Sequence, residues 1–187
     1  MKRGFLLGKF MPPHAGHLAL IGAAQALVDA LTVLVCHLPD DPIPGATRLE
    51  WMRALAPAAR VIGHGEVVPQ APEDSPAFWP IWRKIIAAAH PLGGRVLGLA
   101  EDPVAGLSAS AVRADPAAHW AYLPQVVRAY YRRTICLHGA ESTGKTTLAS
   151  ALARETGALI VGEYGRSHCE AHRGPLRLDD LLLIGRA

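Results

Sequence analysis

The sequence predicts an α/β fold, because short apolar runs alternate with longer segments of helical periodicity. In this order the strands pair in parallel, and helices cover both faces of the sheet. Half of the residues are hydrophobic and 19% are charged, so the chain has material for a buried core and is not disordered. A length of 187 residues fits one domain or two small ones.

Each expected element follows from this periodicity. The expected strands are Gly4–Phe10, Leu31–Leu38, Arg60–Val67, Arg95–Ala100, Thr134–His138 and Ala158–Val161. The expected helices are Gly16–Ala30, Thr47–Ala56, Ala77–Ala89, Pro124–Arg133, Lys145–Thr156 and Asp179–Gly185. A new strand starts directly after Arg133, which predicts a boundary between domains 1–133 and 134–187.

Charge and cysteine content limit the class of partner. The chain has 19 Lys and Arg residues against 16 Asp and Glu residues, and it has no long basic run. This mild positive charge suits a phosphate-bearing small molecule as ligand and argues against nucleic acid. The first apolar stretch is interrupted by glycine and lysine, so we expect no membrane span. The three cysteines, Cys36, Cys136 and Cys169, form no CxxC pair, which favours a reducing compartment, by default the cytoplasm.

The first candidate site is the segment Gly8–His17, which follows a strand and opens a helix. His14 and His17 are three residues apart at the helix start, where free backbone N–H groups attract phosphate. We expect both imidazoles to hold nucleotide phosphates and stabilise departing pyrophosphate, with Gly16 leaving room for the phosphate. The alternatives are ordinary loop and cap histidines, or a metal site that lacks a carboxylate or thiol within the motif.

A second segment, Leu107–Arg113, has two hydroxyls and a cation at an expected loop-to-helix junction. Ser108 and Ser110 are suited to donate to β- or γ-phosphate oxygens, and Arg113 to bind phosphate in a bidentate manner. A helix N-cap explains either serine equally well, but it does not explain Arg113.

The third candidate segment is Gly139–Thr146, which fits the phosphate-binding pattern Gly-x₄-Gly-Lys-[Ser/Thr]. It lies between an expected strand and an expected helix. Backbone N–H groups of such a loop surround the β-phosphate, Lys145 reaches the β- and γ-phosphates, and the Thr146 hydroxyl ligates Mg²⁺. The candidate residues are Gly139, Glu141, Ser142, Thr143, Gly144, Lys145, Thr146 and Thr147.

These motifs resemble known families. Gly8–His17 is similar to the Gly-x-Phe-x-Pro-x-His-x-Gly-His motif of the nucleotidyltransferase superfamily, and Ser108–Arg113 to its Ile-Ser-x-Thr-x-Ile-Arg motif. With Gly139–Thr147 added, the chain resembles, nearly end to end, the NadR-type proteins that join a nicotinamide-nucleotide adenylyltransferase to a ribosylnicotinamide kinase. The resemblance implies a Rossmann-like parallel-sheet nucleotidyltransferase domain, followed by the start of a P-loop NTPase-type α/β domain.

The resemblance also implies a reaction: the nicotinamide mononucleotide phosphate attacks the α-phosphorus of ATP, with Mg²⁺, and yields NAD and pyrophosphate. It implies two groups of residues in the first domain. The catalytic group is Lys9, His14, His17 and Arg113, and the ATP-binding group is Gly8, Phe10, Gly16, Ser108 and Ser110. The chain departs from the family at Ser110 and Val112, where Thr and Ile are usual, and in the short stretch Pro91–Leu107.

Two further segments are candidates for the nicotinamide or riboside. Trp79 and Trp82 share a helix face, where they stack on a ligand ring or pack in the core; core packing is the favoured alternative, and Trp79 is the better ligand candidate. The resemblance also places Glu163, Tyr164 and Arg166 toward nicotinamide riboside. A solvent-exposed ion pair between Glu163 and Arg166 is an equal alternative.

Other functions remain open at this stage. Segment 134–187 is short for a nucleoside kinase, so we expect an incomplete kinase domain, and a nucleotide-binding remnant or sensor without turnover is the alternative to an enzyme. A transcriptional regulator has little support.

His168 and His172 are four residues apart, but the sequence shows no third metal ligand, so a solvated helix face is favoured. Whether the chain forms a homo-oligomer is left open.

Overall fold

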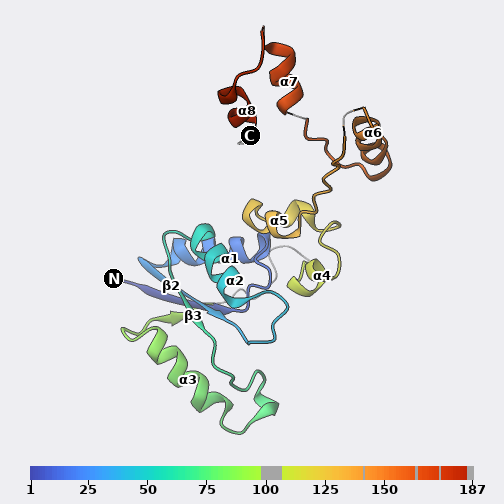
Figure 1. Ribbon diagram of the computed structural model, residues 1–187. Helices are drawn as coiled ribbons and strands as arrows, with labels where there is room; N and C mark the ends of the chain where they lie inside the picture. Colours follow the sequence, from blue (N-terminus) through green and yellow to red (C-terminus); the bar gives the residue numbers. More distant parts are fainter. Residues whose placement is uncertain (98–106, 141, 163, 173, 185–187) are drawn as a thin grey trace. The chain divides into compact units, whose positions relative to one another are not determined.

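The structure is a computed structural model that describes residues 1–97, 107–140, 142–162, 164–172 and 174–184 (Figure 1). The chain divides into two compact units, Met1–Arg133 and Thr134–Ala187. No helix of the described residues is long and apolar enough to cross a membrane.

The first unit is built on a four-stranded sheet in which every pairing is parallel. Its strands lie in the order β3 (Arg60–His64), β2 (Ala30–Cys36), β1 (Arg3–Gly8) and β4 (Arg95–Val96). The sequence prediction of an α/β fold with a parallel sheet is therefore confirmed.

Helices cover both faces of this sheet, because successive side chains of a strand point to opposite faces. Leu6 and Val33 pack beneath α1 (Ala15–Leu27) and α2 (Gly45–Leu55) in one core cluster. Phe5 and Leu34, their chain neighbours, pack in another cluster against α3 (Phe78–Ala89). Figure 1 shows α3 on the face of the sheet away from α1 and α2.

A third cluster packs the last part of the first unit. The helices α4 (Ala109–Ala114) and α5 (Gln125–Tyr131) contribute Val112 and Val127, both fully buried. These side chains pack with Met11 from the loop after β1 and Trp51 from α2. The short turns η1 (Pro72–Asp74) and η2 (Trp120–Tyr122) complete the described elements of this unit.

The second unit contains α6 (Lys145–Thr156), α7 (Tyr164–Ala171) and α8 (Leu178–Ile184). The sequence predicted α6 with the same bounds and α8 within one residue, whereas it did not predict α7. The segment Tyr164–Ala171 is short and polar, so apolar periodicity gives no signal there.

Two predicted strands are wrong. Residues 134–138 and 158–161 are irregular, and in the described part of the chain no backbone hydrogen bond pairs them with a strand. Leu159 is 97% exposed and Val161 92%, so these apolar runs do not pack as strands of a covered sheet do. An apolar run predicts a strand only where a neighbouring strand is present to pair with it.

The other predicted strands are real but shorter. β1 ends at Gly8 instead of Phe10, because Phe10 has a positive φ of 47° and leaves the extended conformation. β2 ends at Cys36 instead of Leu38, and β3 ends at His64 instead of Val67. The predicted strand Arg95–Ala100 is a strand at Arg95–Val96, and residues 98–100 lie outside the described residues.

Candidate functional site

The order of the strands makes the carboxyl end of β1 a candidate position for ligand binding. From β1 the chain adds β2 and β3 on one side, and it then returns through α3 to add β4 on the other side. In open parallel sheets, ligands bind at the carboxyl ends of strands where the order reverses in this way. The carboxyl end of β1 continues directly into the candidate segment Gly8–His17.

The loop after β1 turns sharply at Phe10, whose φ of 47° is uncommon for a residue with a side chain. The Phe10 ring is buried and folds back over Gly8, where an added Cβ would stand 3.3 Å from two ring atoms. The ring also lies against His17, with 5.0 Å between the ring centroids. Gly8 and Phe10 therefore shape the loop that carries the histidines.

The two histidines lie together at the start of α1. His14 is the N-cap residue and is 5% exposed, and its ring centroid lies 3.9 Å from that of His17. The backbone N–H of His14 donates to Nδ1 of His17 over 3.3 Å. Because Nδ1 accepts this bond, the proton of a neutral His17 ring is assigned to Nε2. Gly16 is buried in the first turn of the same helix.

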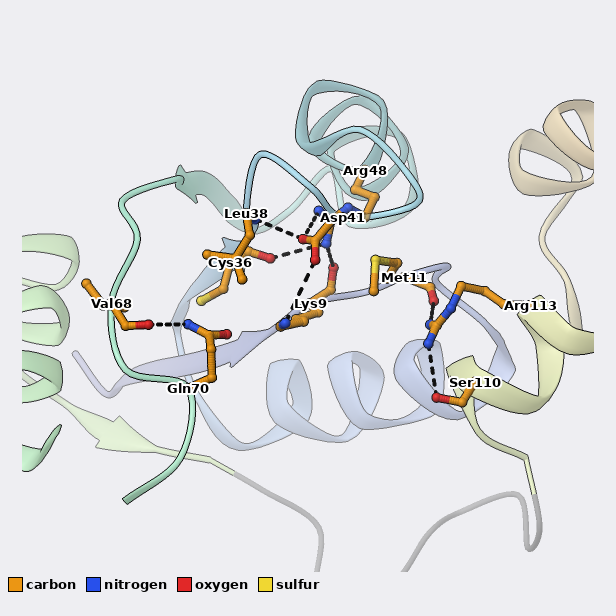
Figure 2. A network of polar contacts seen from close by, with 10 residues as sticks. All are labelled: Lys9, Met11, Cys36, Leu38, Asp41, Arg48, Val68, Gln70, Ser110 and Arg113. Carbon is orange, nitrogen blue, oxygen red and sulfur yellow. Dashed lines mark hydrogen bonds and ion pairs between the residues drawn. The ribbon is translucent and has the colours of Figure 1, made fainter. Parts of the chain in front are cut away.

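Arg113 joins the second candidate segment to the first, although 102 positions separate it from Met11. Its Nη1 donates to the Met11 carbonyl in a short hydrogen bond, and its Nη2 donates to Ser110 Oγ over 3.0 Å (Figure 2). Ser108 is the N-cap of α4 and accepts from the Ala111 N–H over 3.1 Å. The N-cap alternative thus applies to Ser108, while Ser110 and Arg113 face the loop that leads to His14.

A buried ion pair supports the loop from the other side, and the sequence analysis did not predict it. Arg48 of α2 is fully buried, and its Nη2 lies 2.5 Å from Oδ2 of Asp41. Its Nη1 donates to the carbonyl oxygens of Lys9, over 2.8 Å, and Cys36, over 3.2 Å. Arg48 therefore ties the ends of β1 and β2 to α2, as Figure 2 shows.

Asp41 is held in its ionised form by this arrangement. Burial raises its pKa, but hydrogen bonds from the Leu38 N–H and Arg48, with the charges of Arg48 and Lys9, lower the pKa below the ordinary value of 3.8. Lys9 Nζ lies 3.8 Å from Asp41 Oδ1 and keeps 42% of its side chain exposed. Lys9 is thus positioned beside the loop yet accessible to a ligand. A charged residue on the apolar face of α2 was the signal available in the sequence for this pair.

Cys36 lies at the end of β2 beside this ion pair. It is buried, and burial raises the pKa of its thiol to about 11 against the opposing charges of Lys9 and Arg48. The side chain is therefore a neutral part of the core and not a nucleophile.

The two tryptophans of α3 have different environments. Trp82 packs against the core cluster beneath α3, and its Nε1 donates to the Pro69 carbonyl over 2.9 Å. Trp79 is 61% exposed and its ring contacts Phe78 edge-on. Core packing therefore explains Trp82, and only Trp79 remains free to contact a ligand.

In the second unit, the glycine-rich loop closes on itself ahead of α6. Gly139, Ser142 and Gly144 have positive φ values of 155°, 60° and 82°. Lys145 Nζ donates to the carbonyls of Gly139, over 3.0 Å, and Ala140, over 2.7 Å. Turns of this kind aim successive backbone N–H groups at one point, which forms an anion-binding concavity.

The remaining predicted residues of this unit are placed as follows. Thr143 Oγ donates to the Ala140 carbonyl over 2.8 Å, whereas Thr146 and Thr147 are exposed in the first turn of α6. Tyr164 and Arg166 lie in the first turn of α7. Glu141 and Glu163 lie outside the described residues.

Comparison with known proteins bears on each unit. A family model described as "AAA domain" matches residues 134–181, which include the glycine-rich loop. Two curated bacterial proteins are similar to 91% of the chain, and both are called "Trifunctional NAD biosynthesis/regulator protein NadR". The Salmonella typhimurium LT2 protein is 26% identical over 207 aligned positions, and the Escherichia coli K12 protein 27% over 209. The chain spans about half the length of these relatives, 50% of each.

Two solved structures show the same fold over 98% of the chain. One, with a TM-score of 0.72 and 22% identity, is a NadR protein in complex with NR, and the chain covers 60% of it. The other, with a TM-score of 0.68 and 24% identity, is a NadR protein in complex with NAD and AMP-PNP, and the chain covers 62% of it. The chain is therefore similar in sequence and in fold to NadR proteins.

Proposed function

We propose that the first unit is a nucleotidyltransferase that transfers the adenylyl group of ATP to nicotinamide mononucleotide, with NAD and pyrophosphate as products. The observation that carries this proposal is the contact of Arg113 with the Met11 carbonyl and Ser110. It brings the Ser108–Arg113 segment beside the Gly8–His17 loop, at the carboxyl end of β1 where parallel sheets bind nucleotides. The similarity to proteins of NAD biosynthesis supports the choice of substrates.

Each residue has a role in this reaction. A phosphate oxygen of the mononucleotide forms a bond to the α-phosphorus of ATP, and the bond to the bridging oxygen of the β-phosphate breaks. Pyrophosphate leaves with the electron pair, so negative charge grows on the leaving oxygens. The Nε2–H of His17, the N-terminus of α1 and Arg113 donate to these oxygens, and Lys9 adds a positive charge. His14, whose ring centroid lies 3.9 Å from that of His17, is the second imidazole for these oxygens.

We propose that the second unit binds ATP phosphates through residues 139–147, with nicotinamide riboside as the candidate second ligand. The closed loop and the AAA-domain match support phosphate binding. Lys145 would exchange its carbonyl partners for β- and γ-phosphate oxygens. Tyr164, which is 45% exposed, and Arg166 are the candidate contacts for the riboside, together with Glu163.

The residues present suit Mg²⁺, which ATP brings to such sites. Mg²⁺ prefers oxygen ligands, and the exposed Thr146 side chain offers a hydroxyl next to Lys145. When bound, the ion would neutralise part of the phosphate charge.

The test of the first proposal is pyrophosphate release by the full chain with ATP, Mg²⁺ and nicotinamide mononucleotide. We expect His17→Ala to lower kcat by about 10²–10³, the usual effect of removing one donor to developing charge. Arg53→Met is the control and should leave pyrophosphate release unchanged, because Arg53 is exposed on α2 and belongs to neither proposed site.

The same experiment separates the enzyme from a nucleotide-binding protein without turnover. Binding of ATP in calorimetric titration, with no pyrophosphate released by the unaltered chain, would favour the second function. Unchanged release in His17→Ala would refute the role of the histidine pair.

A further inference from the structure

Three side chains that could ligate a metal ion lie between α7 and α8, outside both phosphate-binding segments. His168 is on α7, His172 follows α7 directly, and Asp180 is in the first turn of α8. One ligand atom from each lies within 4.8 Å of the others. No third ligand for the two histidines is visible in the sequence, because Asp180 is eight positions beyond His172; the structure brings it to them.

The geometry brings both rings to one face. The His172 N–H donates to the His168 carbonyl over 2.9 Å, so the helical turn continues to His172. The rings stack with centroids 5.8 Å apart and planes 18° apart. Residues four apart on a helix are neighbours on its surface, and a pair of histidines at this spacing is a common half of a zinc site.

Asp180 completes the set. Its Oδ1 lies 3.2 Å from Nε2 of His168 and 3.8 Å from Nδ1 of His172. Zinc ligands at bond lengths of about 2.0–2.1 Å in a tetrahedron stand about 3.3–3.4 Å from one another, so only small movements are required. The other oxygen, Oδ2, accepts from the Arg177 N–H over 2.8 Å, which fixes the carboxylate with Oδ1 toward the rings.

We propose that His168, His172 and Asp180 bind a divalent transition-metal ion of the Zn²⁺ type, which fastens α7 to α8. Two imidazoles and one carboxylate form a ligand set that suits zinc, and a fourth position remains for water. The side chains are 17%, 31% and 19% exposed, so they are partly desolvated yet open to an entering ion. This proposal goes beyond the proposed function, because none of its three ligands is a proposed nucleotide or riboside contact. His168 does share α7 with Tyr164 and Arg166, and its ring centroid lies 5.9 Å from that of Tyr164.

The test is zinc affinity of the full chain, measured by competition with a chromophoric chelator. We expect one zinc ion per chain, and a loss of affinity of at least about a hundredfold in His172→Ala, since even outer-shell partners account for 10–100-fold. Asp180→Asn keeps the size of the side chain and should also lose zinc affinity. This second variant tests the site even if the histidine variant misfolds. Circular dichroism checks the helix content of each.

Two control variants exclude other ligands. His138→Ala removes an exposed histidine of the same unit, and Cys169→Ser removes the exposed thiol next to His168; both should bind zinc like the unaltered chain. Co²⁺ in the site should show visible d–d bands without thiolate charge transfer. Zinc binding that survives in both His172→Ala and Asp180→Asn, disappears in Cys169→Ser, or is absent from the unaltered chain would overturn the proposal.

Discussion

At the scale of single residues, the first site depends on Arg48 as much as on the histidines. Arg48 contacts no proposed ligand, but its guanidinium binds the Lys9 carbonyl, the Cys36 carbonyl and the Asp41 carboxylate. It therefore fixes the backbone immediately before Phe10, and through Phe10 the position of His17. We regard Arg48 as a positioning residue.

Replacing Arg48 by Met should destabilise the protein by about 3–5 kcal/mol, because it leaves the Asp41 charge buried without its partner. Arg53→Met on the same helix is the control, since Arg53 is exposed. The free energy of unfolding in urea measures both. The double variant Asp41→Asn with Arg48→Met should recover part of the loss; a single Arg48→Met variant as stable as Arg53→Met would contradict the role of the pair.

The Asp41 carboxyl predicts a pH dependence as well. Its folded pKa is below the ordinary value of 3.8, so its contribution to stability is complete above pH 3.8 and is lost as the pH falls through the folded pKa. The difference in unfolding free energy between the unaltered chain and Asp41→Asn should therefore be constant above this pH and narrow below it. Urea unfolding at a series of acidic pH values measures the difference, and a gap that widens on acidification would contradict this assignment.

At the scale of elements, the sequence predicted those parts whose pattern is local. The apolar run of β2 and the loop–helix boundary at Lys145 are written in adjacent residues, and both were predicted correctly or nearly so. The run at 158–161 has the same apolar character, but pairing decides whether such a run is a strand, and pairing depends on distant segments.

The residues of the candidate sites also divide into those in local motifs and those brought together by folding. The motif residues His14, His17 and Lys145 were found by spacing alone, since each motif is contiguous. The Asp41–Arg48 pair and the approach of Asp180 to His168 arise from the folding back of separate elements. No periodicity within one segment encodes such contacts.

The end of α6 provides a prediction at this scale. Gly157 follows the helix with φ 69°, and its N–H donates to the Ala153 carbonyl over 2.9 Å. An added Cβ would meet nothing within 4 Å, so Gly157→Ala tests the backbone conformation alone, with an expected cost of about 1–2 kcal/mol.

Hydrogen exchange of the amides in the last turn of α6 measures this cost. Gly162→Ala is the matched control, because an added Cβ at Gly162 also meets nothing and its φ is not positive. Equal exchange in the two variants would show that the left-handed cap does not hold the end of α6.

At the scale of the whole molecule, we propose two phosphate-binding segments, one in each unit. One lies at the start of α1 in Met1–Arg133, and the other lies before α6 in Thr134–Ala187. Both use the same physical device, a helix N-terminus with a cation nearby. In the proposed reactions, the first would add a histidine pair and Arg113 for charge on a leaving group, while the second would add a lysine that binds phosphates directly.

The most direct test of the central proposal follows the phosphorus atoms of ATP. With α-labelled ATP and nicotinamide mononucleotide, we expect label in the dinucleotide product and an equal amount of pyrophosphate, with no label transferred from γ-labelled ATP to that product. His17→Ala should lower both products together. Formation of product without release of pyrophosphate, or the absence of label in the dinucleotide at saturating ATP and Mg²⁺, would contradict adenylyl transfer by the first unit.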